Sequence, residues 1–525
     1  MTTTLGLYRR IVIQVFLVLV CLSNQNASWA ESIELGQEQE FSYNHLIERA
    51  KKLATEPYGA PAVPHAHILE KIDYDAHGQL HFKREFSPYA TEGGEYPLTF
   101  FHLGRYFKKP VRMFLLKGNH AREIRYSTEY FNMPAQSIAR QLPEDIGFAG
   151  FRFHESRHRK DWKTQDWIAF LGASYFRTIG SEGQYGLSAR GVAVDTATNR
   201  PEEFPDFVEF YIESADGVEN SSTVYALLNG ESITGAYRFD LKRADNVVVE
   251  VEKTLFLRKP VQRLGIAPLT SMFWFSETNK SFAVDWRPEV HDSDGLEMWT
   301  GNGERIWRQL NNPKDVRVSG FVDENPRGFG LMQRDREVTH YLDGVRYHRR
   351  PSLWVEPLHH WGKGQVTLVE LPTDDEIHDN IALFWNPAEQ PKVGEPIHYR
   401  YRMYWQANNP HPMKKLARAT ATRLGRGGNA GQARPEGVSK ISVEWEGEIL
   451  GTLEYGEFPD VVVTASRGEV TLIRAEPIMD TRIWRAVFDL NVTGTEPVEL
   501  RMYLRRNKNQ PLSETWTYQY LPESH

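Results

Sequence analysis

Cysteine is almost absent from this chain of 525 residues: the only one is Cys21. It lies in a short apolar stretch near the N-terminus that resembles part of an export signal, so we expect the mature chain to contain none. The sequence therefore argues against disulfides, a thiol nucleophile and a cysteine metal site. An exported protein without disulfides must rely on a large hydrophobic core, and this chain is long enough to bury one.

Long hydrophobic runs are also missing beyond this stretch, where no segment approaches the roughly 18 apolar residues of a membrane-spanning helix. The stretch itself, Ile11 to Leu22, follows Arg9 and Arg10, and a small-residue cleavage pattern ends at Ala30. We expect residues 1–30 to be a signal peptide and the mature protein to be soluble. The surrounding "LYRRIVI" is a poor twin-arginine signal, so the general secretory route is favoured.

Positive charge is not in excess either. Lys and Arg number 62 against 69 Asp and Glu, which gives a net charge of -7. This balance argues against a nucleic-acid-binding protein, which shows a basic stripe. The sequence also lacks a Walker loop, a G-x-G-x-x-G turn and a G-x-S-x-G elbow, so we expect no organic cofactor.

One motif, "HESRH" from His154 to His158, matches the zinc-protease signature, which requires a helix. The residues that precede it alternate as in a strand. On a strand, residues four apart are separated by about 13 Å, too far to share one zinc ion. We therefore interpret the motif as structural and expect no metal.

Apolar and polar residues alternate with a period of two through most of the chain, after one helical patch at Ser42 to Ala54. The clearest strand patterns are at residues 207–213, 246–258 and 396–405. Long amphipathic helices and strand–helix alternation are both missing. The pattern predicts an all-β fold.

Composition divides the mature chain into three parts. Residues 31–406 form one long strand-rich segment, which we interpret as a large β domain. Residues 407–437 are rich in Gly, Ala and Arg and poor in large apolar residues, so we expect a linker or long loop. Alternating strands then resume over residues 438–525, a length that fits a small immunoglobulin-like sandwich.

Carboxylates beside aromatic residues gather in two clusters. The first is Arg287 to Pro313, and the second is "LPTDDEIHDNIALFW", Leu371 to Trp385. Such clusters suit a glycosidase cleft, in which one acid protonates the leaving oxygen and another takes a proton from water. In that cleft, tryptophans would serve as sugar-stacking platforms, and the candidates are Trp299, Trp307 and Trp354. From the residues alone, solvated acidic turns and core tryptophans remain the alternative.

Long segments of the chain closely resemble the periplasmic glucan biosynthesis proteins OpgG (also MdoG) and OpgD, nearly from end to end. The segments that carry the resemblance include "GFAGFRF", "LGASYFRTIG", "YGLSARGVAVDTA", "GIAPLTSMFWF", "RPEVHDSDGL", "NGERIWRQLNNP", "ENPRGFGLMQRDR", "WGKGQVTLVELPTDDEIHDNIALFW" and "LSETWTYQYLP". Residues 407–437 and the first hundred residues match less well. The weak twin-arginine context favours the G type.

The resemblance implies a large N-terminal, mutarotase-like β-sandwich followed by an immunoglobulin-like domain, in the periplasm. It also implies a role in making osmoregulated periplasmic glucans, whose backbone is β-1,2-linked glucose. Some members of the family are endo-acting β-1,2-glucanases that invert the anomeric centre.

Site residues follow from the resemblance at matching positions. The general acid of the family corresponds to Asp379, its proposed base to Asp292, which acts through a relay, and a cleft tyrosine to Tyr347. We expect Asp379 to lie against an apolar flank that raises its pKa. The remaining acids of the second cluster are interpreted as a solvated turn: Asp374, Asp375 and Glu376.

Two functions stay open. The first is an inverting endo-β-1,2-glucanase that acts during glucan biosynthesis. The second is a non-catalytic protein that binds the same β-1,2-glucan and presents it to a membrane-bound glucan synthase. In either case the expected partner is a polysaccharide and not a nucleic acid, and a homodimer is compatible with both.

Overall fold

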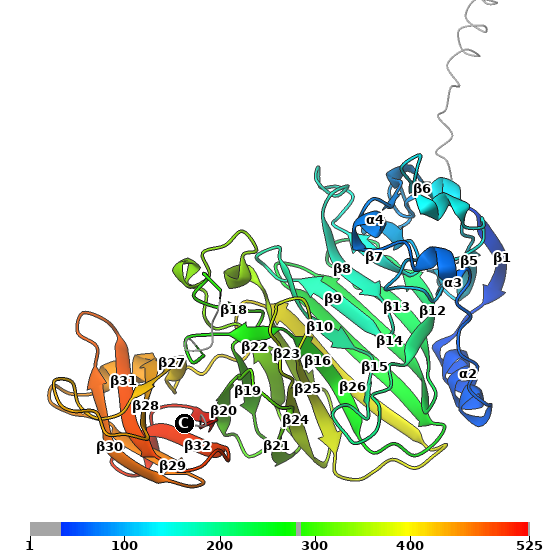
Figure 1. Ribbon diagram of the computed structural model, residues 1–525. Coiled ribbons are helices and arrows are strands. Elements are labelled where there is room, and N and C mark those ends of the chain that lie inside the picture. Colours follow the sequence, from blue (N-terminus) through cyan, green and yellow to red (C-terminus); the bar gives the residue numbers. More distant parts are fainter. Residues whose placement is uncertain (1–32, 280–284, 523–525) are drawn as a thin grey trace, which may run out of the picture.

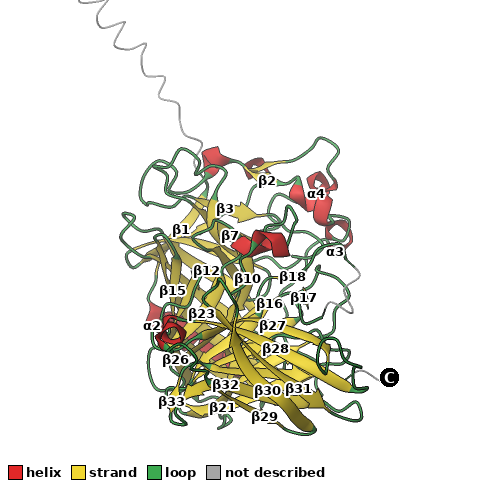
Figure 2. Cartoon of the chain, turned by 90° about the vertical axis from the view of Figure 1, so that its left-hand side faces the viewer, coloured by secondary structure: helices red, strands yellow, loops and turns green. Residues whose placement is uncertain are grey.

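The computed structural model describes residues 33–279 and 285–522. The expected signal peptide, residues 1–30, lies outside the described residues. Strands are the main regular structure of the described chain, and its few short helices lie at the margins (Figure 2). The prediction of an all-β fold is confirmed. In these two described ranges, no helix is both long and apolar enough to cross a lipid bilayer.

The larger of the two main sheets has sixteen strands, and its centre is a regular antiparallel series. Three of the central strands, β12, β15 and β26, coincide with the predicted segments and confirm them. The bounds in sheet order are β1 (Leu35–Glu40), β5 (His120–Ile124), β4 (Arg112–Lys117), β12 (Asp206–Glu213), β13 (Ser222–Asn229), β14 (Ile233–Arg243), β15 (Val247–Leu257), β26 (Pro396–Gln406), β23 (Ser352–Pro357), β22 (Gly328–Met332), β19 (Gly295–Trp299), β20 (Arg305–Gln309), β34 (Thr515–Tyr520), β32 (Val498–Arg506) and β29 (Asp460–Ala465), with β33 (Gln510–Pro511) beside β32.

A ten-stranded sheet packs on the inner face of the first. Its strands are β21 (Arg317–Glu324), β24 (Lys363–Glu370), β25 (Ile381–Pro387), β16 (Leu264–Ser271), β10 (Tyr185–Arg190), β9 (Tyr175–Ile179), β8 (Asp166–Leu171), β7 (Gly150–His154) and β3 (Leu98–Phe101), with β11 (Ala193–Val194) beside β16. Aromatic rings join the two layers: Phe176 of β9 lies 5.3 Å from Phe239 of β14 and 5.9 Å from Trp405 of β26, between ring centroids. These contacts define a β-sandwich with a continuous apolar core.

The predicted N-terminal helix is α2 (Tyr43–Thr55). It begins where the side chain of Ser42 accepts a hydrogen bond from the backbone N–H of His45, which is a typical N-cap. Leu46 and Ala50 face inward and pack over β14 and its neighbours. Two shorter helices, α3 (Ala66–Leu69) and α4 (Tyr74–Gly78), cover one end of the sandwich (Figure 1).

A second sandwich forms the C-terminal end of the molecule (Figure 1). One of its layers is the four-stranded sheet β27 (Arg418–Arg426), β28 (Val438–Glu446), β31 (Ile483–Asn491) and β30 (Glu469–Pro477). The other layer is the end of the sixteen-stranded sheet, because β34 pairs in parallel with β20. The two sandwiches therefore share one sheet, although their apolar cores are separate.

The segment 407–437, which we expected to be a linker or long loop, contains strand β27 and so belongs partly to the second sandwich. The inward-facing positions of β27 hold small side chains, and Ala419 and Thr422 are fully buried. This segment therefore forms a strand although it contains few large apolar residues.

The "HESRH" motif does not form a helix. His154 is the last residue of β7, and its Nε2 lies 2.8 Å from the hydroxyl of Thr99. The next residue, Glu155, accepts a hydrogen bond from Arg243 at 2.8 Å. The prediction that this motif begins in a strand is confirmed, and its polar groups are used in structural contacts.

Candidate active site

Asp292 lies in a loop that directly follows β18 (Val290–His291), a short strand paired with β17 (Phe273–Phe275). Its backbone N–H donates to the carbonyl of Met272 at 2.8 Å, which fixes the loop. The carboxylate is buried and accepts a hydrogen bond from the guanidinium of Arg350. Burial raises the pKa of Asp292 to about 6, with a further contribution from the charge of Asp379, while Arg350 acts in the opposite direction.

Asp379 is held near Asp292 by its neighbour Asn380, and we use the word recess for the region around these two carboxylates. The buried side chain of Asn380 accepts from the backbone N–H of Phe273 at 2.8 Å and donates to the carbonyl of Phe273 at 2.9 Å. This clamp joins the start of β25 to β17, the strand that pairs with β18. The structure thus brings together the two predicted catalytic carboxylates, which are close enough for the charge of one to act on the other.

Among the described residues, the apolar surroundings that we expected around Asp379 are not present. Its side chain is 34% exposed, and its Oδ2 lies 3.9 Å from Nη2 of Arg177. The apolar residues that follow it are buried: Trp385 lies in the core between the sheets, and Phe384 lies in a separate small apolar cluster. The hydrogen bonds of Asn380 mark the edge of the buried region. Asp379 lies outside this region, and the residues that follow Asp379 lie inside it.

Tyr347 begins a single 3₁₀ turn, Tyr347–Arg349, and its hydroxyl donates to the carboxylate of Glu376. Arg287 binds the same carboxylate with two hydrogen bonds, at 2.9 and 3.2 Å. Burial raises the pKa of Glu376, but the hydrogen bonds from Arg287 and Tyr347 outweigh it and hold the pKa below its usual value. Our interpretation of Glu376 as part of a solvated turn was wrong, whereas Asp374 and Asp375 are exposed as expected.

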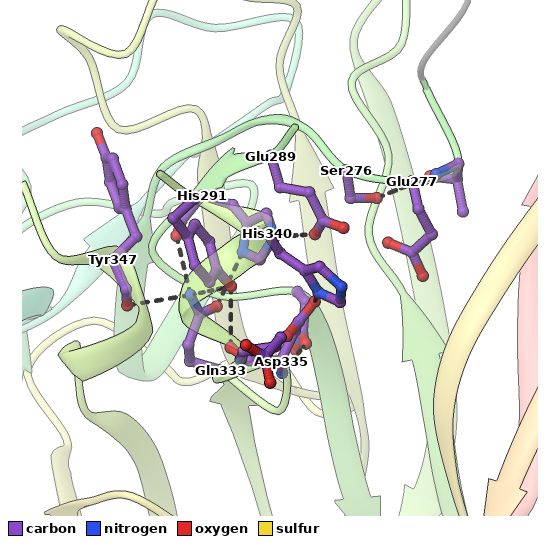
Figure 3. Close-up of polar contacts among 12 residues, drawn as sticks. Ser276, Glu277, Glu289, His291, Gln333, Asp335, His340 and Tyr347 are labelled. Atoms are coloured by element: carbon purple, nitrogen blue, oxygen red, sulfur yellow. Dashed lines mark hydrogen bonds and ion pairs between the residues drawn. The ribbon is translucent and has the colours of Figure 1, made fainter. Parts of the chain in front are cut away.

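A buried polar network contacts the backbone of Tyr347 and of His291, the residue before Asp292 (Figure 3). The amide of Gln333 donates to the carbonyls of Tyr347 and His291, at 3.2 and 3.1 Å. His291 contacts Gln333 through Nδ1 and Glu289 through Nε2, both at 2.9 Å. Burial lowers the pKa of His291, but its hydrogen bond to Glu289 and the charge of that residue raise it to about 9. A protonated His291 donates from both ring nitrogens and fixes the orientation of Gln333.

One group of side chains in this network has the atom types and spacing of a metal site. Glu289, Asp335 and His340 each offer a ligand atom, and these atoms lie within 4.8 Å of one another (Figure 3). Each group already has a protein partner, because His340 Nδ1 lies 2.5 Å from Asp335 and Glu289 contacts His291. We assign these residues to the hydrogen-bond network and place no metal among them.

The predicted stacking platforms are not in the recess. Trp307 and Trp354 are buried, with 2% and 1% exposure, in the apolar core of the second sandwich. The ring of Trp307 is covered by the guanidinium of Arg334, 3.7 Å from its centroid. Trp299 is half-buried, and the guanidinium of Arg305 lies 3.9 Å from its ring. The C-terminal sandwich covers this end of the large sheet and takes up the rings that we expected to bind sugar.

Sequence reasoning missed the arginines that organise the site: Arg177, Arg287 and Arg350. Arg350 lies in the same loop as Tyr347, which was a usable signal. Its partner Asp292, however, is 58 residues away, and the partner Glu376 of Arg287 is 89 residues away. Only the folded chain shows these pairings.

The fold and the site define a class of protein that has two β-sandwiches and a pair of neighbouring carboxylates, Asp292 and Asp379, each in contact with an arginine. The chain matches, over residues 41–520, the family model described as "Periplasmic glucan biosynthesis protein, MdoG". Since this match covers most of the chain, the protein belongs to that family, as the resemblance predicted.

Curated relatives agree with this assignment. The chain is 54% identical to "Glucans biosynthesis protein D 2" of Ralstonia nicotianae, over 94% of this chain and 93% of the relative. It is 45% identical to "Glucans biosynthesis protein D" of Stenotrophomonas maltophilia, over 93% and 91% of the two chains. It is 44% identical to "Probable glucans biosynthesis protein D" of Shewanella oneidensis, over 98% and 95%. These names carry the letter D, whereas we favoured the G type from residues that lie outside the described part of the chain.

Proposed function

We propose that this protein takes part in the biosynthesis of osmoregulated periplasmic glucans as an inverting endo-β-1,2-glucanase. The family and the names of the relatives support the glucan role and the periplasmic location. The observation that carries the catalytic proposal is the proximity of Asp292 and Asp379, of which the first carboxylate is buried and the second is partly exposed. Two carboxylates in different environments are the minimum that glycoside hydrolysis requires.

The proposed reaction assigns one proton transfer to each acid. Asp379 gives a proton to the glycosidic oxygen as the bond between that oxygen and C1 breaks. Water attacks C1 from the opposite face of the ring and passes its proton, through a relay, to Asp292. The products are two shorter glucan chains, one of them with a new reducing end of inverted configuration.

The environment of Asp292 suits a base. With a pKa of about 6, its carboxylate is ionised in about nine of ten molecules at pH 7, and it still has substantial proton affinity. In the proposed reaction Asp379 must hold a proton when the glycosidic oxygen reaches it, and a bound sugar chain would displace water from its partly exposed side chain.

Tyr347, Glu376 and Arg287 would order the loops that flank the substrate. Their hydrogen bonds tie the turn at Tyr347 to the loop that ends at Asp379. Because the two carboxylates lie on different loops, this connection limits how far they can move apart. The loops are then already ordered before the glucan binds, so ordering them does not weaken its binding.

The direct test is incubation of the mature protein with linear β-1,2-glucan, with the products followed by proton NMR. We expect new reducing ends that appear first as the α-anomer, because the substrate linkage is β and the mechanism inverts. A first product with the β-anomer would contradict inversion. Absence of new reducing ends at any time would contradict hydrolysis.

A second candidate function, glucan binding without cleavage, is favoured by the exposure of Asp379 and its proximity to Arg177. An exposed carboxylate beside an arginine can accept hydrogen bonds from sugar hydroxyls without taking part in proton transfer. In that case the recess would hold the nascent glucan and present it to a membrane-bound synthase. Tight binding of the glucan with no product in the NMR experiment would identify this function.

A further inference from the structure

A large cavity lies at the junction of the two sandwiches, away from the paired carboxylates. Its volume is about 1190 Å³, above the range of roughly 300–1,000 Å³ that is typical of small-molecule sites. The large sandwich supplies Arg334 to its wall, and the segment that follows β26 supplies Asn408 and Lys414. The second sandwich supplies Arg482 and Trp484. Ligand sites often form at such domain junctions.

The charges on the wall are nearly balanced. The cations are Arg334, Lys414, Arg418 and Arg482, and the anions are Glu297, Glu446 and Glu448. Several of these groups neutralise one another, as in the contact of Arg334 with Glu297 at 2.9 Å. A cavity with this balance selects neither an anion nor a cation. It offers both hydrogen-bond donors and acceptors, which is what a neutral polyhydroxylated ligand requires.

Some of the lining groups are free to bind such a ligand. Within residues 33–279 and 285–522, Lys414, Arg482 and Glu448 form no ion pair, and the side-chain amide of Asn408 has no hydrogen-bond partner. Trp484 is half-buried, and its ring meets the edge of Phe458 at 6.0 Å. An aromatic ring beside free amide, carboxylate and guanidinium groups is suited to sugar rings, which have both apolar faces and hydroxyls.

A chain of contacts connects the cavity wall to the candidate active site. Arg336 donates to the carbonyl of Ala407, which lines the cavity, at 2.9 Å. The same guanidinium donates to the carbonyl of Arg350 at 3.0 Å, and Arg350 binds Asp292. Through these contacts, a ligand in the cavity would affect the position of Arg350 and, through it, of Asp292.

We propose that this cavity is a second β-1,2-glucan site, which holds a part of the polysaccharide outside the catalytic recess. The inference rests on the proposed function for the identity of the sugar. It makes the protein bivalent for one glucan chain, so long chains gain affinity over short ones without any change in the recess.

The test is calorimetric titration of the full mature protein with short linear β-1,2-gluco-oligosaccharides, in an Asp379→Asn background that prevents cleavage. We expect two sites per protein chain. Adding Trp484→Ala, or the pair Asn408→Ala and Arg482→Ala at exposed positions, should leave one site. Tyr347→Ala should remove the other, and Tyr455→Ala, on a fully exposed aromatic outside the cavity, should keep both.

The outcomes separate this inference from the proposed function. A single site that is lost only in the Tyr347→Ala variant overturns the second site and leaves the recess as the glucan-binding site. Loss of one of two sites in the cavity variants supports it, even if the wild-type protein releases no reducing ends. Two sites that persist in both cavity variants also overturn it.

Discussion

Arg334 in the large sandwich donates hydrogen bonds to both carboxylate oxygens of Glu514 in the C-terminal sandwich, at 2.6 and 3.0 Å. Its Nη2 also donates to Glu297 at 2.9 Å, and all three side chains are nearly inaccessible to solvent. Burial lowers the pKa of Arg334, but the two carboxylates outweigh it and hold the pKa above its usual value. This ion-pair network therefore joins the two sandwiches, and burial shields its three charged side chains from water.

Replacement of this arginine should be costly. We expect Arg334→Met to lower the free energy of unfolding by about 3–5 kcal/mol, because it leaves Glu514 and Glu297 buried without a cation. Urea denaturation measures the loss. Lys392→Met is the control, since Lys392 forms an exposed ion pair with Glu395 and should matter by less than about 1 kcal/mol. Equal stability of the two variants would show that the network does not hold the sandwiches together.

Asp379→Asn should abolish most of the cleavage and leave the fold intact. We expect the rate of β-1,2-glucan hydrolysis to fall at least about 100-fold, the usual contribution of a general acid. The melting temperature should hardly change, because the side chain is partly exposed and, among the residues that the structure describes, forms no hydrogen bond that secures the core. Asp375→Asn, an exposed acid of the same loop, is the control and should cleave normally. A fast Asp379→Asn enzyme would remove this residue from the acid role.

The pH profile should depend on Asp292. A base must be ionised, so kcat/KM should fall as the pH drops through about 6, the pKa of Asp292. Arg350 lowers that pKa, and Arg350→Met should therefore move the acidic limb of the profile to higher pH. Arg349→Met, next to it in sequence but directed to Glu182, should leave the limb in place. An unmoved limb in the Arg350 variant would mean that another group controls it.

Lys253 is a buried cation in the core of the large sandwich, where its amine donates to the carbonyl of Gly191 at 2.8 Å. Burial lowers the pKa of Lys253 from 10.5 to about 7. Between these values the unfolded chain binds more protons than the folded one, so this residue makes stability rise with pH in that window. The burial of Lys253 lowers the free energy of unfolding most below pH 7 and no longer lowers it above pH 10.5.

Lys253→Met should therefore stabilise the protein by roughly 2–3 kcal/mol at pH 6, after the lost hydrogen bond and aromatic contacts are deducted. The gain should shrink steadily towards pH 10. Urea denaturation at several pH values measures both effects, and Lys242→Met, an exposed lysine on β14, should show neither. A gain that is independent of pH would contradict the titration of Lys253.

Trp354 should act on stability and not on sugar binding. Because the ring is buried in the core of the second sandwich, Trp354→Ala should cost about 3–5 kcal/mol of unfolding free energy. The affinity of the folded fraction for glucan should be unchanged in the recess. Trp286→Ala removes an exposed ring and serves as the control for stability. A specific loss of binding at the recess in the Trp354 variant would restore the role that the sequence suggested.

The strands were predictable where large apolar residues alternate with polar ones. β26 and the first half of β15 show this pattern because one face of each packs into the core, whereas β12 is buried at most positions on both faces. β27 was missed because its buried positions hold residues such as Ala419 and Thr422, which read equally well as loop. A strand can be recognised from its sequence when large apolar residues mark its buried face. Where the buried positions hold small residues, as in β27, the sequence carries no such mark.

The proposed catalytic carboxylates came from family resemblance, whereas their surroundings did not. The local sequence around Asp379 suggested apolar neighbours, but the clamp at Asn380 separates it from them. Trp307 and Trp354 were misjudged for a related reason, since the residues that cover them come from segments far along the chain. Burial is a property of the folded molecule, and an isolated tryptophan does not reveal which surface will cover it.

The parallel pairing of β20 with β34 has a consequence for biogenesis. Trp307 and Thr517, which meet across this pair, are separated by 210 residues. A ribosome makes β20 long before β34, so the open margin of β20 must wait unpaired while the intervening chain is synthesised. An unpaired strand margin invites wrong pairing with other chains. We therefore expect a chaperone to keep the nascent protein unfolded until β34 has been synthesised. A chain truncated before β34 would keep the edge of β20 unpaired and would be prone to aggregate.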